Sequence, residues 1–278
     1  MKKTFTIRIA DKGKNLQDYL TFQLKLSRRK AKELIDSRNV LVNRRRVWMA
    51  KHVLEKDDTV EILNFQSSET EIPSTIRILF QDGDFIAADK PAGVLSNEDG
   101  SSVEALLRQQ LQSPEIQAVH RLDRDTSGCL LLAKNSAAFR SMIDLFRQKA
   151  VRKTYHAIVA GYVEKDAQEI TLRIDDEHAL TKIRRLDGNK KASHLSVLIE
   201  TGRTHQIRKH LDMIDHPVLG DRQYGMRFGV AEFADDIPRQ MLHSYSIEFK
   251  NPANGLGIFV KSPLPDDFKR SLDKLRLK

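Results

Sequence analysis

The sequence predicts an α+β protein with two domains of unequal size, because 278 residues exceed the length of most single domains. Three observations support this fold class. Stretches with strand-like alternation recur along the chain, segments with helical spacing are interspersed among them, and a Ser-, Thr- and Glu-rich stretch with a proline interrupts both patterns at residues 64–75. We therefore expect a small α/β domain over residues 1–65, a linker over 66–75, and a domain of mixed, mainly antiparallel sheet with flanking helices over 76–278.

The first domain is expected to contain two helices and short strands. The first helix is predicted by apolar residues with helical spacing, Leu16, Tyr19, Leu20 and Leu24. The second is expected to open at Leu26-Ser27-Arg28-Arg29, with Ser27 as its N-cap. Alternating apolar residues predict two strands, Val40 with Val42 and Val60 with Ile62, and Asn43-Arg44 is the turn that follows the first of them.

The second domain is expected to open with a hairpin. Residues 76–80 and 85–88 have strand character and are joined by the turn Gln81-Asp82-Gly83-Asp84. Ser101-Ser102-Val103-Glu104 has capping-box spacing and predicts a helix. Another helix is predicted by an apolar face, Phe139, Met142, Ile143 and Phe146. Further strands are expected over residues 129–133, 155–160, 192–199 and 245–249.

The formal net charge of +9 is concentrated at one end of the chain. Residues 1–65 contain 16 Lys and Arg against 8 Asp and Glu, whereas the remainder contains 31 against 30. This concentration suits a polyanion such as nucleic acid, because each phosphate neutralised by Lys or Arg releases counterions. The alternative is a solvated basic face that serves solubility, and charge alone does not separate the two.

Two classes of protein are disfavoured. The longest apolar runs, such as Cys129-Leu130-Leu131-Leu132-Ala133, are far shorter than the roughly 18 residues of a membrane-spanning helix. Arg8 interrupts the stretch that would be continuously apolar in a signal peptide. Cys129 is the only cysteine, so no internal disulfide can form. We expect a cytoplasmic protein without a membrane segment.

The strongest candidate for chemistry is the run His120-Arg121-Leu122-Asp123-Arg124-Asp125-Thr126-Ser127-Gly128. It places two acids, two arginines, a histidine, a threonine and a serine directly before a predicted buried strand. Judged by composition alone, a surface turn in which Asp and Ser bond their own backbone is the better interpretation. The order of the residues favours a catalytic loop instead.

This order resembles, position for position, the signature of the RluA family of pseudouridine synthases. Further motifs of the family occur in the right places, namely Asp89-Lys90-Pro91-Ala92-Gly93, Lys153-Thr154-Tyr155, Thr201-Gly202-Arg203-Thr204-His205-Gln206-Ile207-Arg208-Lys209-His210 and His216-Pro217-Val218-Leu219-Gly220-Asp221. The resemblance covers residues 76–252. The stretch from Gly161 to Thr201 departs from it, because many relatives carry longer insertions there.

The resemblance implies an enzyme that isomerises specific uridines of structured RNA to pseudouridine. The reaction breaks the glycosidic bond, rotates the uracil and rejoins it to the same sugar through carbon, without net redox change. A carboxylate can act as nucleophile or electrostatic partner in these steps without a metal or cofactor. The family assigns that role to the aspartate that corresponds to Asp123. The sequence leaves open whether Asp123 attacks the sugar or assists elimination to a glycal.

Three more residues complete the site that the resemblance implies. A carboxylate in a closed pocket needs an opposing cation to stay ionised, and Arg208, on a helix expected over residues 205–211, matches the family's partner of the aspartate. The target base must leave its stack. Tyr155 matches the tyrosine that stacks on the extruded uracil and is the candidate to move its C5 proton, while Arg121 matches the arginine that fills the gap in the RNA. Without the resemblance, Arg208 would be a surface arginine and Tyr155 a half-buried strand residue.

We expect no metal and no cofactor. The histidines lack His-Glu-X-X-His spacing and have no paired cysteines beside them, so structural hydrogen bonding, or RNA contact by His120, is the better interpretation. Lys90-Pro91-Ala92-Gly93 lacks the spacing of a phosphate-binding loop and is expected to be a shaped turn beside the active site.

Residues 14–62 resemble the small RNA-binding domain named after a small-subunit ribosomal protein. The resemblance rests on Leu26-Ser27-Arg28-Arg29, Leu34-Ile35, Val40-Leu41-Val42-Asn43 and Asp57-Asp58-Thr59-Val60. Arg44 and Asp57 stand where glycines are common in that family, and Arg38-Asn39 stands where a glycine usually precedes the strand. The resemblance implies that a basic surface grips RNA phosphates, and it assigns that role to Arg28, Arg29, Lys32, Arg44, Arg45 and Arg46.

Members of the RluA family with this N-terminal domain commonly act on ribosomal RNA, so large-subunit rRNA is the expected partner and a monomer the expected state. Three alternatives remain open. They are a pseudouridine synthase acting on transfer RNA, a non-catalytic RNA-binding ribosome-assembly protein, and a hydrolase with an aspartate nucleophile. A decayed enzyme would be expected to lose Asp123 or Arg208, and a hydrolase needs a second acid as proton donor, for which Asp125 is the nearest candidate.

Overall fold

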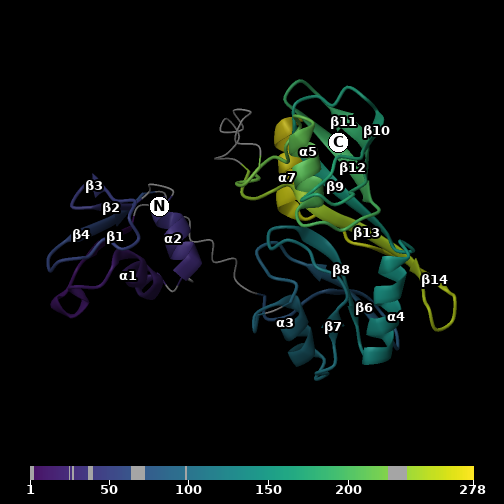
Figure 1. Ribbon diagram of the computed structural model, residues 1–278, viewed down its shortest axis with the longest axis horizontal. Coiled ribbons are helices and arrows are strands. Elements are labelled where there is room, and N and C mark those ends of the chain that lie inside the picture. The colour runs from purple at the N-terminus through teal and green to yellow at the C-terminus, as the bar shows by residue number, and fades with distance from the viewer. Residues whose placement is uncertain are drawn as a thin grey trace. The chain divides into compact units, whose positions relative to one another are not determined.

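The computed structural model describes residues 3–24, 26, 28–36, 40–63, 73–97, 99–224 and 237–278, and the side chains of Arg29, Lys30 and Glu33 are outside that description. The chain divides into two compact units, Met1–Glu69 and Thr70–Lys278 (Figure 1). Each unit has its own sheet and its own hydrophobic core.

The N-terminal unit is a small antiparallel sheet packed with two helices. Its elements are β1 (Lys3–Thr6), a 3-10 turn (Ile9–Asp11), α1 (Leu16–Gln23), α2 (Arg28–Asp36), β2 (Val40–Val42), β3 (Arg45–Arg46) and β4 (Thr59–Ile62). The strand order is β1-β4-β2-β3. The apolar residues predicted to face inward meet in one core, where Leu16 and Leu20 of α1 pack with Ile35 of α2. Asn15 caps α1 by accepting a hydrogen bond from the Asp18 backbone at 2.8 Å.

Two tight turns of this unit use left-handed backbone at non-glycine residues. Asn43 and Arg44 join β2 to β3 with φ of 50° and 63°, and Asp57 has φ of 68°. The Asn43 side chain offsets the conformational cost, because it donates to Asp58 and accepts from the Thr59 backbone. These turns thus use the left-handed backbone that glycine adopts most readily. The predicted N-cap Ser27 lies outside the described residues.

The C-terminal unit is built on one large, mainly antiparallel sheet, so the predicted fold class is confirmed. Its elements are β5 (Ile78–Gln81), β6 (Phe85–Lys90), α3 (Val103–Gln110), β7 (Gln117–Ala118), β8 (Ser127–Ala133), α4 (Ser136–Arg147), β9 (Arg152–Ala160), β10 (Ala167–Ile170), β11 (Thr181–Gly188), β12 (Ala192–Ile199), α5 (Gln206–Met213), β13 (Leu242–Lys250), β14 (Gly257–Lys261) and α7 (Asp266–Leu275). The order is β10-β11-β12-β9-β13-β8-β6-β5, with β14 beside β13 and β7 beside β8. The short β8–β13 pairing is parallel, so two strands more than 100 residues apart in sequence lie side by side.

Helices cover both faces of this sheet. One core contains Leu107 of α3 and Ile207 of α5 together with Tyr155 of β9. A second contains Met142 of α4, and a third contains Phe268 of α7. Since side chains alternate along β9, the face that carries Tyr155 is packed by α3 and α5, and the opposite face meets α7.

One local prediction is wrong in detail. The capping-box spacing at Ser101 and Glu104 does not produce a capping box, because Ser102 is the N-cap of α3 and accepts from the Ala105 backbone. Glu104 instead accepts a hydrogen bond from the Ala118 backbone at 2.8 Å. The carboxylate is thus the hydrogen-bond acceptor for a backbone N–H of β7. Local spacing does not reveal this contact, because the two residues are 14 positions apart.

Gly128 ends the run of residues 120–128 at the place where β8 pairs with β13. It has φ of 111°, and a Cβ there would lie 2.1 Å from the Ser244 carbonyl oxygen. We expect Gly128→Ala to destabilise the unit by more than about 4 kcal/mol, since the obstacle is backbone. Urea unfolding measures the loss. Gly83→Ala is the matched control, because a Cβ there meets nothing within 4 Å, and an equal loss in both variants would contradict the explanation.

Candidate active site

Asp123 lies in the loop between β7 and β8, which a buried lysine holds in shape. Lys90, at the end of β6, donates to the carbonyl oxygens of Pro91 (3.0 Å), Arg124 (2.8 Å) and Thr126 (2.8 Å). These acceptors match the three hydrogens of an ammonium group, although burial lowers the pKa of Lys90 to about 7. The motif that contains Lys90 therefore forms a shaped turn beside Asp123, as the sequence predicted.

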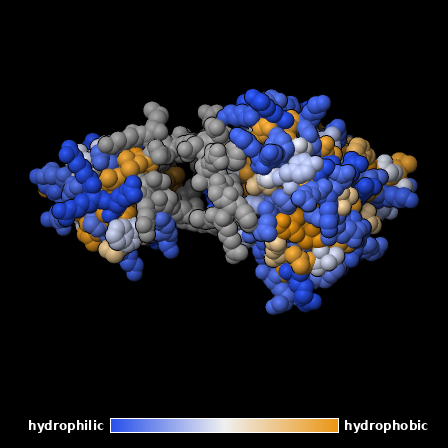
Figure 2. All heavy atoms as spheres, turned by 90° about the horizontal axis from the view of Figure 1, so that it is seen from above, coloured by the Kyte–Doolittle hydropathy of each residue, from blue (hydrophilic) through white to orange (hydrophobic). Residues whose placement is uncertain are grey.

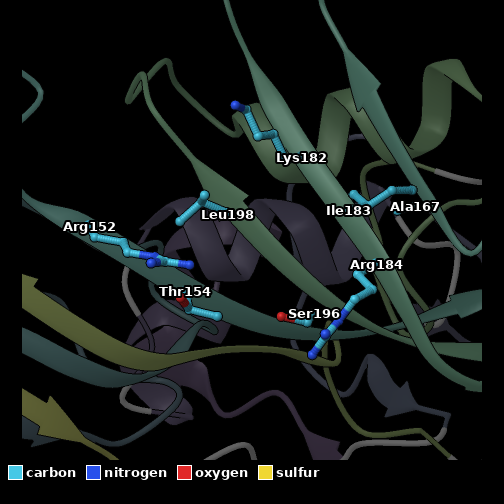
Figure 3. Close-up of a pocket in the computed structure, with 8 residues that line it drawn as sticks. All are labelled: Arg152, Thr154, Ala167, Lys182, Ile183, Arg184, Ser196 and Leu198. Atoms are coloured by element: carbon cyan, nitrogen blue, oxygen red, sulfur yellow. The ribbon is translucent and has the colours of Figure 1, made fainter.

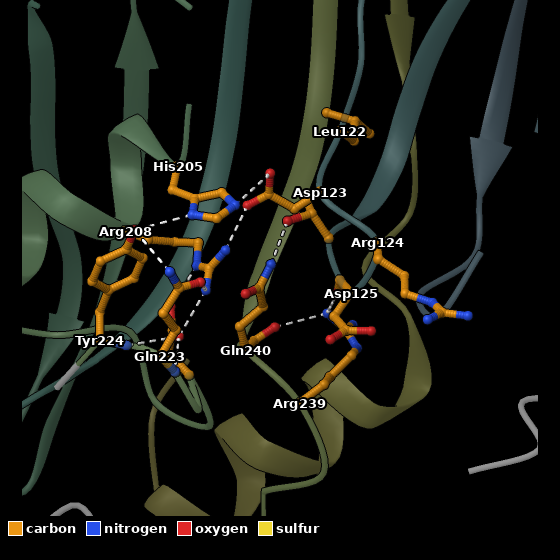
Figure 4. A network of polar contacts seen from close by, with 12 residues as sticks. Leu122, Asp123, Arg124, Asp125, His205, Arg208, Gln223, Tyr224, Arg239 and Gln240 are labelled. Carbon is orange, nitrogen blue, oxygen red and sulfur yellow. Dashed lines mark hydrogen bonds and ion pairs between the residues drawn. The ribbon is translucent and has the colours of Figure 1, made fainter. Parts of the chain in front are cut away.

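Arg208 of α5 points toward the Asp123 carboxylate (Figure 4) and also binds a second carboxylate, that of Asp221. Its Nη1 donates to Asp123 Oδ2 at 2.9 Å, while Nε and Nη2 donate to the two oxygens of Asp221 at 2.6 and 2.9 Å. The Asp221 side chain is 0% exposed and that of Arg208 is 8% exposed. Burial by itself lowers the pKa of Arg208, but hydrogen bonds and charges from Asp221 and Asp123 outweigh burial and the net shift is upward. Arg208 is therefore a permanent cation held against Asp123 by a bidentate pair behind it.

His205 and Tyr224 extend this network. His205 Nε2 lies 3.8 Å from Asp123 Oδ1, and its Nδ1 is 3.0 Å from the Tyr224 hydroxyl. The Arg208 guanidinium lies over the Tyr224 ring, 5.0 Å from its centroid. Burial lowers the pKa of His205, opposed by Asp123, so the ring is neutral at pH 7. Neutral His205 leaves Arg208 as the cation that opposes the Asp123 carboxylate.

Tyr155 lies on β9 opposite Ser244 of β13, and only 5% of its surface is exposed. The Ser244 hydroxyl donates to the Cys129 carbonyl oxygen at 3.0 Å. Burial strongly raises the pKa of Tyr155, and the negative charge of Asp123 adds to the rise. The phenol is protonated in the free protein, which suits a stacking surface or proton donor.

Arg121 and His120 precede Asp123 and differ in environment. Arg121 is exposed. His120 Nε2 instead accepts a hydrogen bond from the Leu131 backbone at 3.0 Å, its ring packs against Phe146, and burial lowers its pKa to about 3. The neutral, hydrogen-bonded ring of His120 anchors the loop, and its RNA contact stays a prediction.

The predicted phosphate-binding residues of the N-terminal unit are mostly at its surface. Arg44, Arg45 and Arg46 are exposed on the β2–β3 hairpin, and Lys32 is exposed on α2. Arg28 is exposed but paired with Asp18 at 2.7 Å. The side chain of Arg29 lies outside the described residues.

The sequence assigns no function to two residues of this network, Asp221 and Arg239. Asp221 was recognised only as the end of a motif. Arg239 was not singled out, and it binds both oxygens of Asp267 while its Nη1 donates to the Asp125 carbonyl at 3.0 Å. A charged residue directly after Gly220 in an otherwise apolar segment is a signal for Asp221, but Arg239 follows no comparable pattern.

In the described part of the chain, no three His, Cys, Asp or Glu side chains are grouped so as to hold a metal ion. No helix among those same residues is long and apolar enough to cross a membrane.

A cavity of about 340 Å³ lies away from Asp123 (Figure 3). It is lined by Arg152, Thr154, Ala167, Lys182, Ile183, Arg184, Ser196 and Leu198. Arg152 and Thr154 alternate with Tyr155 along β9, so this cavity opens on the opposite face of the strand. It is separate from the network around Arg208.

Comparison with known proteins identifies the family. Residues 84–213 match the model of the RNA pseudouridylate synthase family. The chain is 36% identical over 238 residues to the ribosomal large subunit pseudouridine synthase D of Nitrosomonas europaea, covering 77% of this chain and 69% of that protein. The enzyme of the same name from Pseudomonas aeruginosa is 33% identical over 230 residues, 72% of each chain. The chain belongs to the RNA pseudouridine synthase family, and it is an enzyme that isomerises uridine in RNA to pseudouridine.

A solved structure agrees with the fold. Human RNA pseudouridylate synthase domain containing 4 superposes with a TM-score of 0.62 at 24% identity, covering 72% of this chain and 93% of that one. An uncharacterized RNA pseudouridine synthase of Mycoplasma genitalium is 29% identical over 305 residues and covers all of this chain, including its N-terminal unit.

Proposed function

We propose that this enzyme converts specific uridines of large-subunit ribosomal RNA to pseudouridine, with Asp123 as the catalytic carboxylate. The observation that carries the catalytic assignment is the Asp123–Arg208–Asp221 arrangement, in which a buried arginine with its own counter-ion opposes the Asp123 carboxylate at 2.9 Å. The names of the relatives from Nitrosomonas europaea and Pseudomonas aeruginosa support the choice of RNA.

The proposed sequence of events starts with extrusion of the uridine from its stack. Arg121 fills the vacated space, and the base enters between Asp123 and Tyr155. Asp123 then acts at the sugar, either by attack or by assisting elimination, while the Arg208 guanidinium lies against its carboxylate. Because the Tyr155 phenol is protonated in the free protein, it first serves as the stacking surface. It takes part in moving the C5 proton only after the base has changed its surroundings.

The substrate is tested by mapping pseudouridines in total RNA from cells with and without the gene. The proposal expects specific positions of large-subunit rRNA to lose pseudouridine in the deletion strain and to regain it when the purified enzyme is added without cofactor. Loss at transfer RNA positions alone would replace the proposed substrate by transfer RNA. Unchanged maps for both RNAs would overturn the proposal.

We further propose that residues 1–65 form an RNA-binding domain of the small ribosomal-protein type, joined by the linker 66–75 to the catalytic domain 76–278. Its support is the basic composition and the exposed cluster Arg44, Arg45 and Arg46. We place the enzyme in the cytoplasm as a monomer, and sedimentation of the purified protein tests the oligomeric state.

Neutralising the hairpin cluster tests this domain. The triple variant Arg44→Gln, Arg45→Gln, Arg46→Gln is expected to weaken rRNA binding and to lower the slope of log affinity against log salt by about 2, as loss of two to three phosphate contacts requires. Filter binding at several salt concentrations measures both. Lys12→Gln with Lys56→Gln is the matched control, since both are exposed and have acidic neighbours in Glu55 and Asp57. An unchanged slope in the triple variant would refute the role.

A further inference from the structure

Lys153 is a buried lysine that makes no ion pair with any carboxylate of the described residues. Four lysines and arginines are buried in the described part of the chain, Lys90, Lys153, Arg208 and Arg239. Lys90 donates to three carbonyls, Arg208 binds two carboxylates and Arg239 binds Asp267. Lys153 is 9% exposed, and among the described residues its ammonium group makes a cation–π contact with Phe146 alone, where Nζ lies 5.2 Å from the ring centroid.

The position of Lys153 is next to the proposed active site. It precedes Tyr155 by two residues on β9, so both side chains lie on the same face of the strand, about 7 Å apart along it. Its neighbours across the sheet are Ile199 at the end of β12 and Ile247 of β13. A Cβ placed on Gly202 would lie 4.0 Å from Nζ. Lys153 therefore lies beside the loop that leads from β12 to Arg208.

Lys153 also interacts electrostatically with the loop that carries Asp123. The charge of Lys153 contributes to the low pKa of His120, which anchors that loop. In the described part of the chain, Asp212 Oδ1 is the only side-chain oxygen or nitrogen that is fully buried and has no hydrogen-bond partner. Because Lys153 Nζ has no hydrogen-bond partner there either and is not such an atom, it keeps some contact with solvent. An anion arriving from solvent can thus reach the ammonium group.

A mostly buried, unpaired charge is costly, and a contact with one aromatic ring compensates only part of the cost. Such a group is stabilised when a ligand supplies the missing anion. The anion that a ribosomal RNA substrate carries at every nucleotide is the phosphodiester group. Gly202, without a side chain, leaves the approach to Nζ unobstructed.

We propose that Lys153 binds a phosphate of the RNA strand next to the target uridine. This proposal rests on the proposed function, because it needs RNA in the cleft beside Tyr155. Lys153 is then an RNA-binding residue that places the strand, while the chemistry remains with Asp123.

The test compares Lys153→Met and Lys153→Arg with the unmodified enzyme, using large-subunit rRNA purified from cells that lack the gene. Lys153→Met is expected to raise Kd about tenfold and to lower the salt slope by about 0.7 to 0.9, the loss of one phosphate contact, with kcat at saturating RNA unchanged. Lys153→Arg should retain most of the affinity. Arg152→Gln is the matched control, because this neighbouring cation is exposed on the opposite face of β9, and its Kd should not change.

A pH profile adds a readout that a purely structural lysine would not give. Burial lowers the pKa of Lys153 to about 8, so the free enzyme loses this charge as pH rises through that value. Between pH 7 and pH 9 the affinity of the unmodified enzyme should fall more steeply than that of Lys153→Arg, because loss of the Lys90 charge, with a pKa of about 7, is common to both proteins. His120 is neutral throughout this range, and the other neighbours, Phe146, Ile199, Ile247 and Gly202, do not titrate.

The outcomes are distinguishable. A folded Lys153→Met variant with unchanged Kd and salt slope overturns the proposal, as does a loss of kcat at unchanged Kd. If Lys153→Met does not fold, the pH profiles decide, and a parallel fall in Lys153→Arg overturns it. An unmodified enzyme that binds this rRNA but changes none of its uridines refutes the proposed substrate, while the Kd comparison at Lys153 still stands.

Discussion

Asp123→Asn is expected to abolish pseudouridine formation while the fold and RNA binding persist. The amide has the shape of the carboxylate and can still accept a hydrogen bond from Arg208, but it has lost the negative charge and the nucleophilic oxygen. Arg208 keeps its bidentate pair with Asp221, so no buried cation is left without a partner. We expect the rate to fall by about 10⁴-fold or more and the stability to change by less than about 1 kcal/mol.

The measurement is tritium release from rRNA labelled at C5 of uridine, with filter binding for affinity. Asp125→Asn is the matched control, since Asp125 is an exposed acid two residues away and was the candidate for the second acid of a hydrolase. We expect that variant to remain active. Full activity in Asp123→Asn would remove the proposed catalytic role, and equal inactivation of both variants would revive the two-acid alternative.

Arg208→Met is expected to cause a large loss of stability together with a loss of activity. It leaves the fully buried Asp221 carboxylate without its cation, and breaking a buried pair in this way costs about 3 to 5 kcal/mol. It also removes the cation that opposes Asp123. Urea unfolding and the tritium assay measure the two effects separately.

A double variant separates structure from chemistry. Arg208→Met combined with Asp221→Asn has no unpaired buried charge, and the Asn oxygen can still accept from the Gln223 and Tyr224 backbones as Asp221 does. It should regain most of the lost stability yet remain inactive. Recovery of activity in the double variant would show that Arg208 acts only by supporting the fold.

Local pattern was sufficient to predict the elements that carry the site. Strand alternation placed β9 and β12, helical spacing placed α4, and the motif order placed Arg208 on α5 within bonding distance of Asp123. The strands and the helix depend on neighbours in sequence. The Arg208–Asp123 contact came from the family resemblance, in which the two matching residues are already paired.

The parts that could not be predicted depend on contacts between distant segments. Glu104 abandons the capping box to bind the Ala118 backbone. His120 turns inward because the Leu131 backbone offers a hydrogen bond. Arg239 binds Asp267, more than 25 positions away in sequence, and the Asp125 carbonyl, more than 110 positions away. Burial and pairing decide these side chains, and neither is encoded in spacing.

The pairing of β8 with β13 has a consequence for synthesis of the protein. The loop that carries Asp123 leaves the ribosome early. Its contacts come from a much later part of the chain, because Ser244 of β13 pairs with Gly128 and Arg239 donates a hydrogen bond to the Asp125 carbonyl. This contact joins residues more than 110 positions apart, and the entropy cost of closing so long a loop makes it a late event in folding. A nascent chain released before β13 would lack the central strand of its sheet, so the enzyme gains activity only when translation is nearly complete.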